Sequence, residues 1–246
     1  ALVMTLPLLA GRVVPVRVRI ALIAALAVVI LPATKTVALP TNALSLGMGL
    51  VHEALIGAMM GLSLTLMLTA AQLAGSIVEN LCGFSLASFG VGGDGDSGGG
   101  VFARLFWWTA VAVFVASGGL NQVVGSVMQS FVTLPPGAAS ADRSLLEFLV
   151  QALSQSFEFG LMAALPAVAA LLVASAVLGM AQKNFPQLGG MHVGLGLKAV
   201  CGMLAASLVL ISLPWMIRGG FDLSILQIEE LVQQLAAGLQ DWSQNG

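Results

Sequence analysis

Charged residues are rare along this chain, and the stretches between them are long and apolar. Five stretches carry no charge at all: Ile20–Thr34, Ala54–Val78, Leu105–Ala141, Phe159–Gln182 and Ala199–Ile217. A helix needs roughly 20 apolar residues to cross a hydrocarbon core of about 30 Å, and three of the stretches are at least that long. Backbone polar groups inside lipid must be satisfied within their own segment, so helix is the state that fits these runs. The pattern predicts an all-α integral membrane protein.

Glycine, proline and amide residues interrupt the apolar stretches. Pro166 lies inside the fourth stretch, and the third contains Gly118, Gly119, Asn121, Gln122 and Gly125. Broken helices are tolerated in a membrane only where other protein or water satisfies the freed backbone groups. We therefore expect kinked helical hairpins that pack against other protein, within a single hydrophobic domain over residues 1–220.

The composition excludes several classes of protein. Of the 246 residues, 58% are hydrophobic and 8% are charged, whereas soluble domains have about a quarter of their residues charged. The net charge of −2 comes without a basic cluster that could follow a phosphate backbone, so no nucleic-acid partner is expected. Cys82 and Cys201 are far apart, form no metal-binding pair, and are expected to be small buried hydrophobic residues. Ala1 already lies in an apolar stretch, and we expect that the native N-terminus is missing.

The last part of the chain, residues 221–246, has a different pattern. Apolar residues recur at spacings of three and four, which places them on one side of a helix: Ile225, Ile228, Val232, Leu235, Leu239 and Trp242. Ser224 and Gln227 resemble a capping box at the start of such a helix. The polar side has Glu229, Glu230 and Asp241 but no basic residue, so an anionic lipid surface would repel it. We expect an amphipathic C-terminal helix that packs on a partner protein or on the rest of this chain.

No motif carries convincing catalytic or metal-binding chemistry. The string around Ser97 matches the nucleophile sequence of chymotrypsin-like proteases, but it lies in a Gly/Asp/Ser run, and no β-barrel is predicted to position His52 or His192. His52 and Glu53 begin like a zinc-protease helix, but Ile56 stands where the second histidine should be. We therefore expect no catalytic residue, no bound metal, no cofactor and no enzyme activity.

Two acidic residues and three glycines in the apolar region are candidate functional positions. Glu53 and Glu79 bracket an uncharged stretch of 25 residues, and ionisable groups in such positions are costly in lipid. They would form a proton relay or line a conduit. Alternatively, they would be helix-end residues in an aqueous region, or partners of basic residues on a neighbouring subunit. Gly57 and Gly61 are spaced for close helix packing, and Gly75 is a third candidate packing residue.

Several segments, taken in order, resemble one family, that of FliR of the flagellar export apparatus and its type III secretion counterpart SctT. The segments that carry the resemblance are Pro15–Arg19, Glu53–Gly61, Gln72–Gly75, Gly83–Phe89, Ser130–Pro135, Phe185–Leu188 and Gly196–Lys198. Their order and spacing cover nearly the whole chain, and only the beginning of the first helix lacks a counterpart.

The resemblance implies a core subunit of a protein export gate in the bacterial inner membrane, at the flagellar basal body or the base of a secretion system. Such a subunit would assemble with FliP-like and FliQ-like subunits, with an FlhB-like subunit alongside, into a conduit for unfolded export substrates. The resemblance also implies a plug, for which the candidates are Phe84, Ser85, Leu86, Ala87, Ser88 and Phe89. The alternative role for these residues is ordinary helix packing.

A second functional hypothesis is a proton-coupled small-solute transporter. In that protein His52, Glu53 and Glu79 would face a shared cavity. Transporters of this class are often built from internal repeats, and the two halves of this chain have no convincing self-similarity. The sequence therefore favours the export gate. A third class, an intramembrane protease that uses Ser97, would lose all activity on Ser97→Ala.

Overall fold

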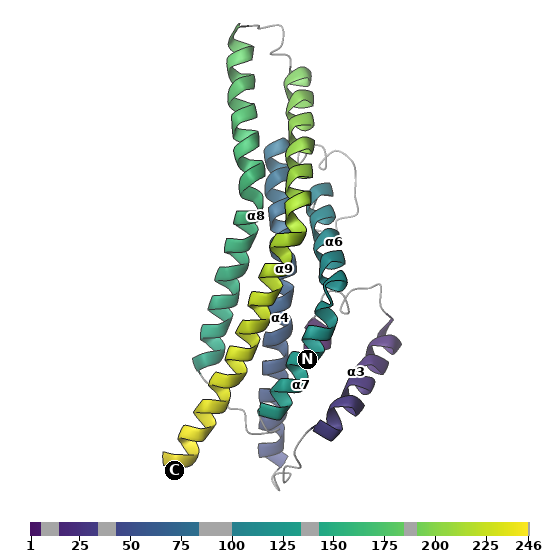
Figure 1. Cartoon of the computed structure of the whole chain (residues 1–246), viewed down its shortest axis with the longest axis vertical. Helices are drawn as coiled ribbons and strands as arrows, with labels where there is room; N and C mark the ends of the chain where they lie inside the picture. Colours follow the sequence, from purple (N-terminus) through teal and green to yellow (C-terminus); the bar gives the residue numbers. More distant parts are fainter. Residues whose placement is uncertain (6–14, 34–42, 84–99, 134–142, 185–190, 246) are drawn as a thin grey trace. The chain divides into compact units, whose positions relative to one another are not determined.

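The apolar stretches form helices in the computed structural model, which describes residues 1–5, 15–33, 43–83, 100–133, 143–184 and 191–245. Over these ranges the chain forms seven α-helices, one short 3-10 helix (η1) and no strand (Figure 1). Their bounds are α1 Leu2–Thr5, α3 Val16–Ile30, η1 Leu31–Ala33, α4 Ala43–Cys82, α6 Val101–Ala116, α7 Gly119–Thr133, α8 Arg143–Asn184 and α9 Met191–Asn245.

Three helices of the described chain are long and apolar enough to cross a membrane. The candidate spans are Leu46–Cys82 in α4, Ser144–Ala181 in α8 and Lys198–Ala236 in α9. The pair α6 and α7 adds a fourth if it is counted as one broken span. The prediction of an all-α integral membrane protein is confirmed.

The third apolar stretch is broken where the sequence predicts it, but the fourth is not. Ser117 and Gly118 separate α6 from α7, and Gly118 has a φ of +78°, a conformation that residues with a Cβ rarely adopt. In contrast, α8 continues through Pro166, so the expectation of a break there is wrong. Proline removes one hydrogen bond from a helix, and the long apolar segments on both sides of Pro166 sustain the helix despite that loss.

The described chain divides into two compact units. Unit 1 comprises Ala1–Met67, Val115–Gln155 and Phe221–Gly246, and unit 2 comprises Leu68–Phe114 and Ser156–Gly220. The boundary predicted between residues 220 and 221 lies inside the continuous helix α9, at the point where that helix passes from unit 2 to unit 1. The division into a domain 1–220 and a helix 221–246 stays a prediction.

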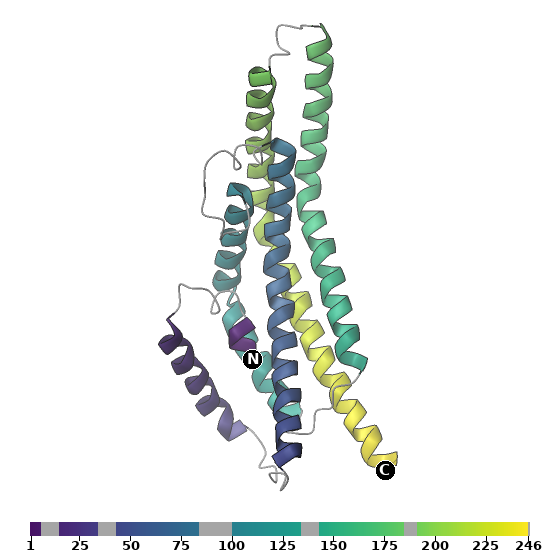
Figure 2. The same cartoon turned by 180° about the vertical axis from the view of Figure 1, so that it is seen from behind.

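The second half of α4 is the central element of unit 2 (Figures 1 and 2). Residues on it are almost fully buried: Leu68, Ala70, Ala71, Ala74, Val78 and Cys82. Most of these side chains are small, which lets neighbouring helix backbones approach closely. Cys82 is buried as expected, whereas Cys201 is partly exposed.

Glycines on α8 and α9 allow two of these close approaches. A Cβ atom at Gly160 of α8 would lie 2.9 Å from the carbonyl oxygen of Ala70 on α4. A Cβ atom at Gly202 of α9 would overlap the side chain of Cys82. Both helices therefore pack on α4 at distances that only glycine permits at these positions.

In unit 1, α1 packs against the first half of α4. A Cβ atom at Gly57 would be 3.4 Å from that of Ala1, and one at Gly61 would overlap the side chain of Thr5. The hydroxyl of Thr65 lies 2.8 Å from the carbonyl oxygen of Thr5, to which it donates a hydrogen bond. These contacts attach the first described residues to α4.

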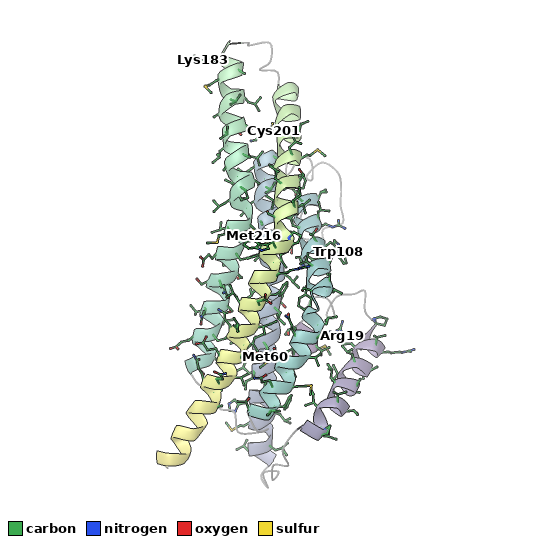
Figure 3. The ribbon with its side chains drawn as sticks, in the orientation of Figure 1. Arg19, Met60, Trp108, Lys183, Cys201 and Met216 are labelled. Carbon is green, nitrogen blue, oxygen red and sulfur yellow. The ribbon has the colours of Figure 1, made fainter. Side chains whose placement is uncertain are left out.

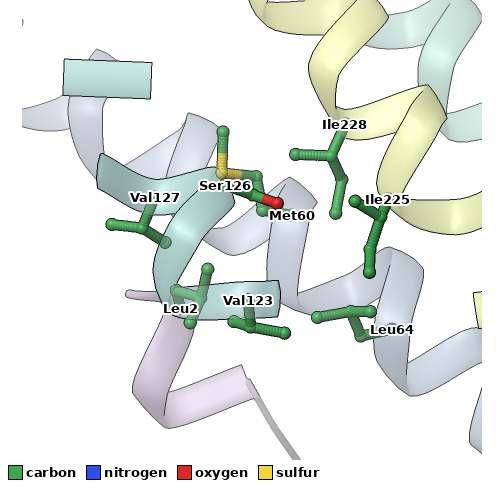
Figure 4. A pocket seen from close by; sticks show the side chains of 8 residues that line it. All are labelled: Leu2, Met60, Leu64, Val123, Ser126, Val127, Ile225 and Ile228. Atoms are coloured by element: carbon green, nitrogen blue, oxygen red, sulfur yellow. The ribbon is translucent and has the colours of Figure 1, made fainter. Parts of the chain in front are cut away.

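An apolar pocket marks the meeting point of α1, α4, α7 and α9 in unit 1. Met60 is among its lining residues (Figures 3 and 4), which also include Leu2, Leu64, Val123, Ser126, Val127, Ile225 and Ile228. It contains no space for a water molecule. The pocket is thus part of the packed core of unit 1.

The C-terminal part of α9 packs through its apolar side on other helices of unit 1. This is one of the two alternatives that the sequence left open. Ile228, Val232 and Leu235 are buried within unit 1. The capping box predicted at Ser224 and Gln227 is wrong, because α9 begins at Met191 and both residues lie in its interior. The helical pattern continues upstream, so no new helix starts there.

Candidate functional site

Glu79 lies in the last turn and a half of α4, and its carboxylate is buried against the start of α6. The residue is 5% exposed. Its Oε2 atom accepts a hydrogen bond from the backbone N–H of Phe102 at 3.1 Å. A buried carboxylate in an apolar bundle therefore has a defined partner in unit 2.

The carboxylate serves as the cap of α6. The first backbone N–H groups of a helix have no partner within the helix, and a side chain just before the helix usually accepts one of them. The residue before α6 is Gly100, which has no side chain, so Glu79 supplies the acceptor from another helix. The helix macrodipole further favours a negative charge at this end.

Gly100 is the residue that makes room for this carboxylate. A Cβ atom at Gly100 would overlap the carboxyl group of Glu79. One turn earlier on α4, Gly75 faces the same part of α6, since its Cβ would lie 2.6 Å from the carbonyl oxygen of Phe102. We call Gly75, Glu79, Gly100 and Phe102 the α4–α6 junction.

The junction joins the end of α4 to the start of α6, and the stretch of chain between these two helices contains the predicted plug. The plug candidates Phe84–Phe89 lie outside the described residues, and so does Ser97. The chain leaves α4 through Gly83, which has a φ of +80° and donates its N–H to the carbonyl oxygen of Asn80 at 3.2 Å. The next residue that the structure describes is Gly100.

The other predicted site residues have different surroundings. Glu53 is partly exposed and belongs to unit 1, whereas Glu79 is buried and belongs to unit 2. Gly57 and Gly61 face α1. Within the described ranges, no group of three or more His, Cys, Asp or Glu side chains is placed to hold a metal ion.

Sequence reasoning missed Gly100, Phe102 and the contact between Thr5 and Thr65. Gly100 is the last of a run of glycines, so its close contact with Glu79 leaves no distinct local signal. Phe102 participates through its backbone, which the residue type does not reveal. Threonine in an apolar helix commonly bonds the carbonyl four residues earlier, as Thr65 also does with Gly61, so its second partner was not apparent.

Comparison with known proteins gives consistent similarities across most of the chain. The family described as bacterial export proteins, family 1, matches residues 1–224. The flagellar biosynthetic protein FliR of Caulobacter vibrioides is 28% identical over 229 residues, which cover 87% of this chain and 87% of the relative. FliR of Escherichia coli is 29% identical over 86% of this chain and 82% of the relative. The secretion system apparatus protein SsaT of Salmonella typhimurium is 23% identical over 66% of this chain and 62% of the relative.

Proposed function

The chain belongs to the bacterial export proteins of family 1, and from this premise we propose that it is a core subunit of a protein export gate. It is an integral membrane component of a flagellar or type III secretion export apparatus. The finer proposal is that it forms, with FliP-like and FliQ-like subunits, the conduit for unfolded export substrates. The observation that carries this proposal is the family match over residues 1–224.

The proposed location is the bacterial inner membrane, at the flagellar basal body or the base of a secretion system, with an FlhB-like subunit alongside. The apolar spans of α4, α8 and α9 support placement in a membrane. The exposed faces of these helices are rich in large apolar side chains, among them Leu50, Leu161 and Leu208. Lipid and neighbouring subunits would share these faces.

The proposed plug is the segment of Phe84, Ser85, Leu86, Ala87, Ser88 and Phe89. Two aromatic rings with Leu86 and Ala87 between them suit an apolar constriction, which holds back ions and water until a chain enters. The α4–α6 junction supports this proposal because it holds together the end of α4 and the start of α6, the two helices between which the segment lies in the sequence. Ordinary helix packing is the competing role.

The remaining candidate residues are proposed to have structural roles. Glu79 caps α6, which accounts for a buried acid without a proton relay. Gly57, Gly61 and Gly75 allow close helix packing. Residues 1–220 would form the hydrophobic export-gate domain, and the helix of residues 221–246 would pack onto it through its apolar side.

We also propose that the chain has no enzyme activity and no cofactor. The relatives are named as flagellar biosynthetic and secretion apparatus proteins, and the gate function requires apolar and hydrogen-bonding surfaces without a reacting group. The energy for export would come from other components of the apparatus.

The test is export itself, measured in cells that lack this chain. Deletion should leave export substrates in the cytoplasm, and the intact chain supplied in trans should restore their secretion. Uptake of small solutes should be unchanged. Normal export in the deletion strain, together with loss of solute uptake, would favour the transporter hypothesis instead.

A further inference from the structure

The helix α7 carries a polar stripe on its exposed side. Asn121, Gly125 and Gln129 are spaced by four residues, so they lie on one face of the helix, and Gln122 lies beside them. All four residues are exposed. A Cβ atom at Gly125 would have no neighbour within 4 Å. We call these four residues the polar face of α7.

The polar face continues into a cavity between α7 and α9 of unit 1, and the surface that lines this cavity is mixed, with polar and apolar parts. This cavity has a volume of about 100 Å³. Its polar lining residues are Ser126, Gln129, Ser130 and Thr133 of α7 with Glu229 and Gln233 of α9. Gln129 belongs to both features, so the stripe and the cavity form one surface. The opposite side of α7, with Val123 and Val127, lines the apolar pocket (Figure 4).

This surface belongs to candidate membrane spans, where lipid is an unfavourable neighbour for it. The polar face lies in the broken pair α6 and α7, and Glu229 and Gln233 lie in the span Lys198–Ala236. Amide and carboxyl groups without hydrogen-bond partners cost several kcal/mol in hydrocarbon, so exposed ones face water or protein. The surface therefore needs a wet or hydrogen-bonding neighbour.

We propose that the polar face of α7 and the adjoining cavity form part of the wall of a water-filled conduit and contact the main chain of an extended, unfolded polypeptide. This inference rests on the proposed function and assigns the residues that meet the substrate. Side-chain amides both donate and accept hydrogen bonds, so they match the peptide groups that every substrate carries whatever its sequence. Gly125 leaves space for a backbone to approach, and the cavity provides room for bridging water.

A membrane helix of another subunit fits this surface less well. Helices that pack in membranes meet mainly through small residues that let the backbones approach closely, and their polar side chains then hydrogen-bond across the contact. On the polar face only Gly125 is small, and Asn121, Gln122 and Gln129 extend from the positions around it. An extended chain can pass along such side chains and exchange hydrogen bonds with them one residue at a time.

The experiment is site-specific photo-crosslinking in cells that contain the complete apparatus and an export substrate stalled by a fused folded domain. A photo-reactive amino acid replaces Gln122 or Gln129 in separate variants. Matched controls carry it at Leu120 or Val124, each one residue before a member of the polar face and so rotated by about 100° around the helix. We expect the photo-reactive amino acid at position 122 or 129 to form an adduct with the stalled substrate. This adduct should disappear when the stalled substrate is absent. The control positions should form little adduct.

Two results would overturn the inference: adducts from Gln122 and Gln129 to another membrane subunit in place of the substrate, or equal substrate adducts at all four positions. Secretion of the substrate is also measured for each variant. It distinguishes a failure of the inferred contact from a failure of the proposed export function. Normal secretion without an adduct contradicts only the contact inferred here, whereas a wild-type chain that supports no secretion contradicts the export role itself.

A second measurement tests the same inference if the variants with the photo-reactive amino acid assemble poorly. Gln122→Cys and Gln129→Cys, in a Cys201→Ser background, should react with a membrane-impermeant thiol reagent and be protected by the stalled substrate. Leu120→Cys should react slowly and show no protection. Absence of reaction at both glutamine positions in assembled complexes would also refute the conduit wall.

Discussion

The Oε2 atom of Glu79 accepts a hydrogen bond from the backbone N–H of Phe102 at 3.1 Å, and this contact ties the end of α4 to the start of α6. The two residues are 23 positions apart in the chain. The carboxylate replaces the capping side chain that Gly100 lacks, and Gly100 in turn leaves the space that the carboxylate fills. Glu79 and Gly100 therefore depend on each other.

Glu79→Ala is expected to destabilise unit 2. It removes the acceptor of the partly buried N–H group of Phe102, and loss of a helix cap costs about 1 kcal/mol. Glu79→Gln keeps an oxygen acceptor and should retain part of this stability. Thermal unfolding of the detergent-solubilised protein measures both variants, with Glu158→Ala, at an exposed position of α8 in the same unit, as the control. Equal midpoints for Glu79→Ala and the wild type would contradict the capping role.

Gly75→Ala is expected to destabilise the protein, because its Cβ would lie 2.6 Å from the Phe102 carbonyl oxygen and force α6 away from α4. Gly179→Ala is the matched control, since Gly179 is also inside a helix but has no neighbour within 4 Å of its Cβ position. Alanine there should be neutral or stabilise by up to about 1 kcal/mol. Unfolding midpoints that change equally in the two variants would be inconsistent with close packing at Gly75.

Thr65→Val is expected to loosen the attachment of α1 to α4. It removes the hydroxyl that lies 2.8 Å from the Thr5 carbonyl oxygen, a hydrogen bond worth about 1 kcal/mol. Thr65→Ser retains the hydroxyl and serves as the control. Hydrogen exchange of the first five residues should accelerate in the valine variant only. Identical exchange in both variants would show that this bond does not hold the segment.

The helices could be predicted from the sequence, but the contacts between them could not. The long uncharged stretches identified α4, α8 and α9, and the glycine-rich part of the third stretch identified the break at Gly118. Pro166 was misleading because its effect depends on how well the flanking segments sustain the helix. The partnership of Glu79 with Gly100 requires the helices to be placed in space, and the glycine run gives no local pattern that distinguishes Gly100.

The proposed plug predicts that the resting membrane leaks ions when its aromatic rings are removed. Phe84→Ala and Phe89→Ala should each raise the ion conductance of cells that contain the assembled apparatus but are not exporting. The rings would fill an apolar constriction, and alanine leaves room for water. Phe157→Ala, at an exposed position on α8, is the control. Unchanged conductance in both plug variants would leave ordinary packing as the role of this segment.

If this chain is a core subunit of an export gate, it should be isolated in one particle together with the other gate subunits. The full-length chain would be co-expressed with the FliP-like and FliQ-like subunits of the same organism, and the mass of the detergent-solubilised particle that contains it would be measured. We expect a single defined particle with all three subunits. A chain that purifies alone or as a homo-oligomer would contradict it.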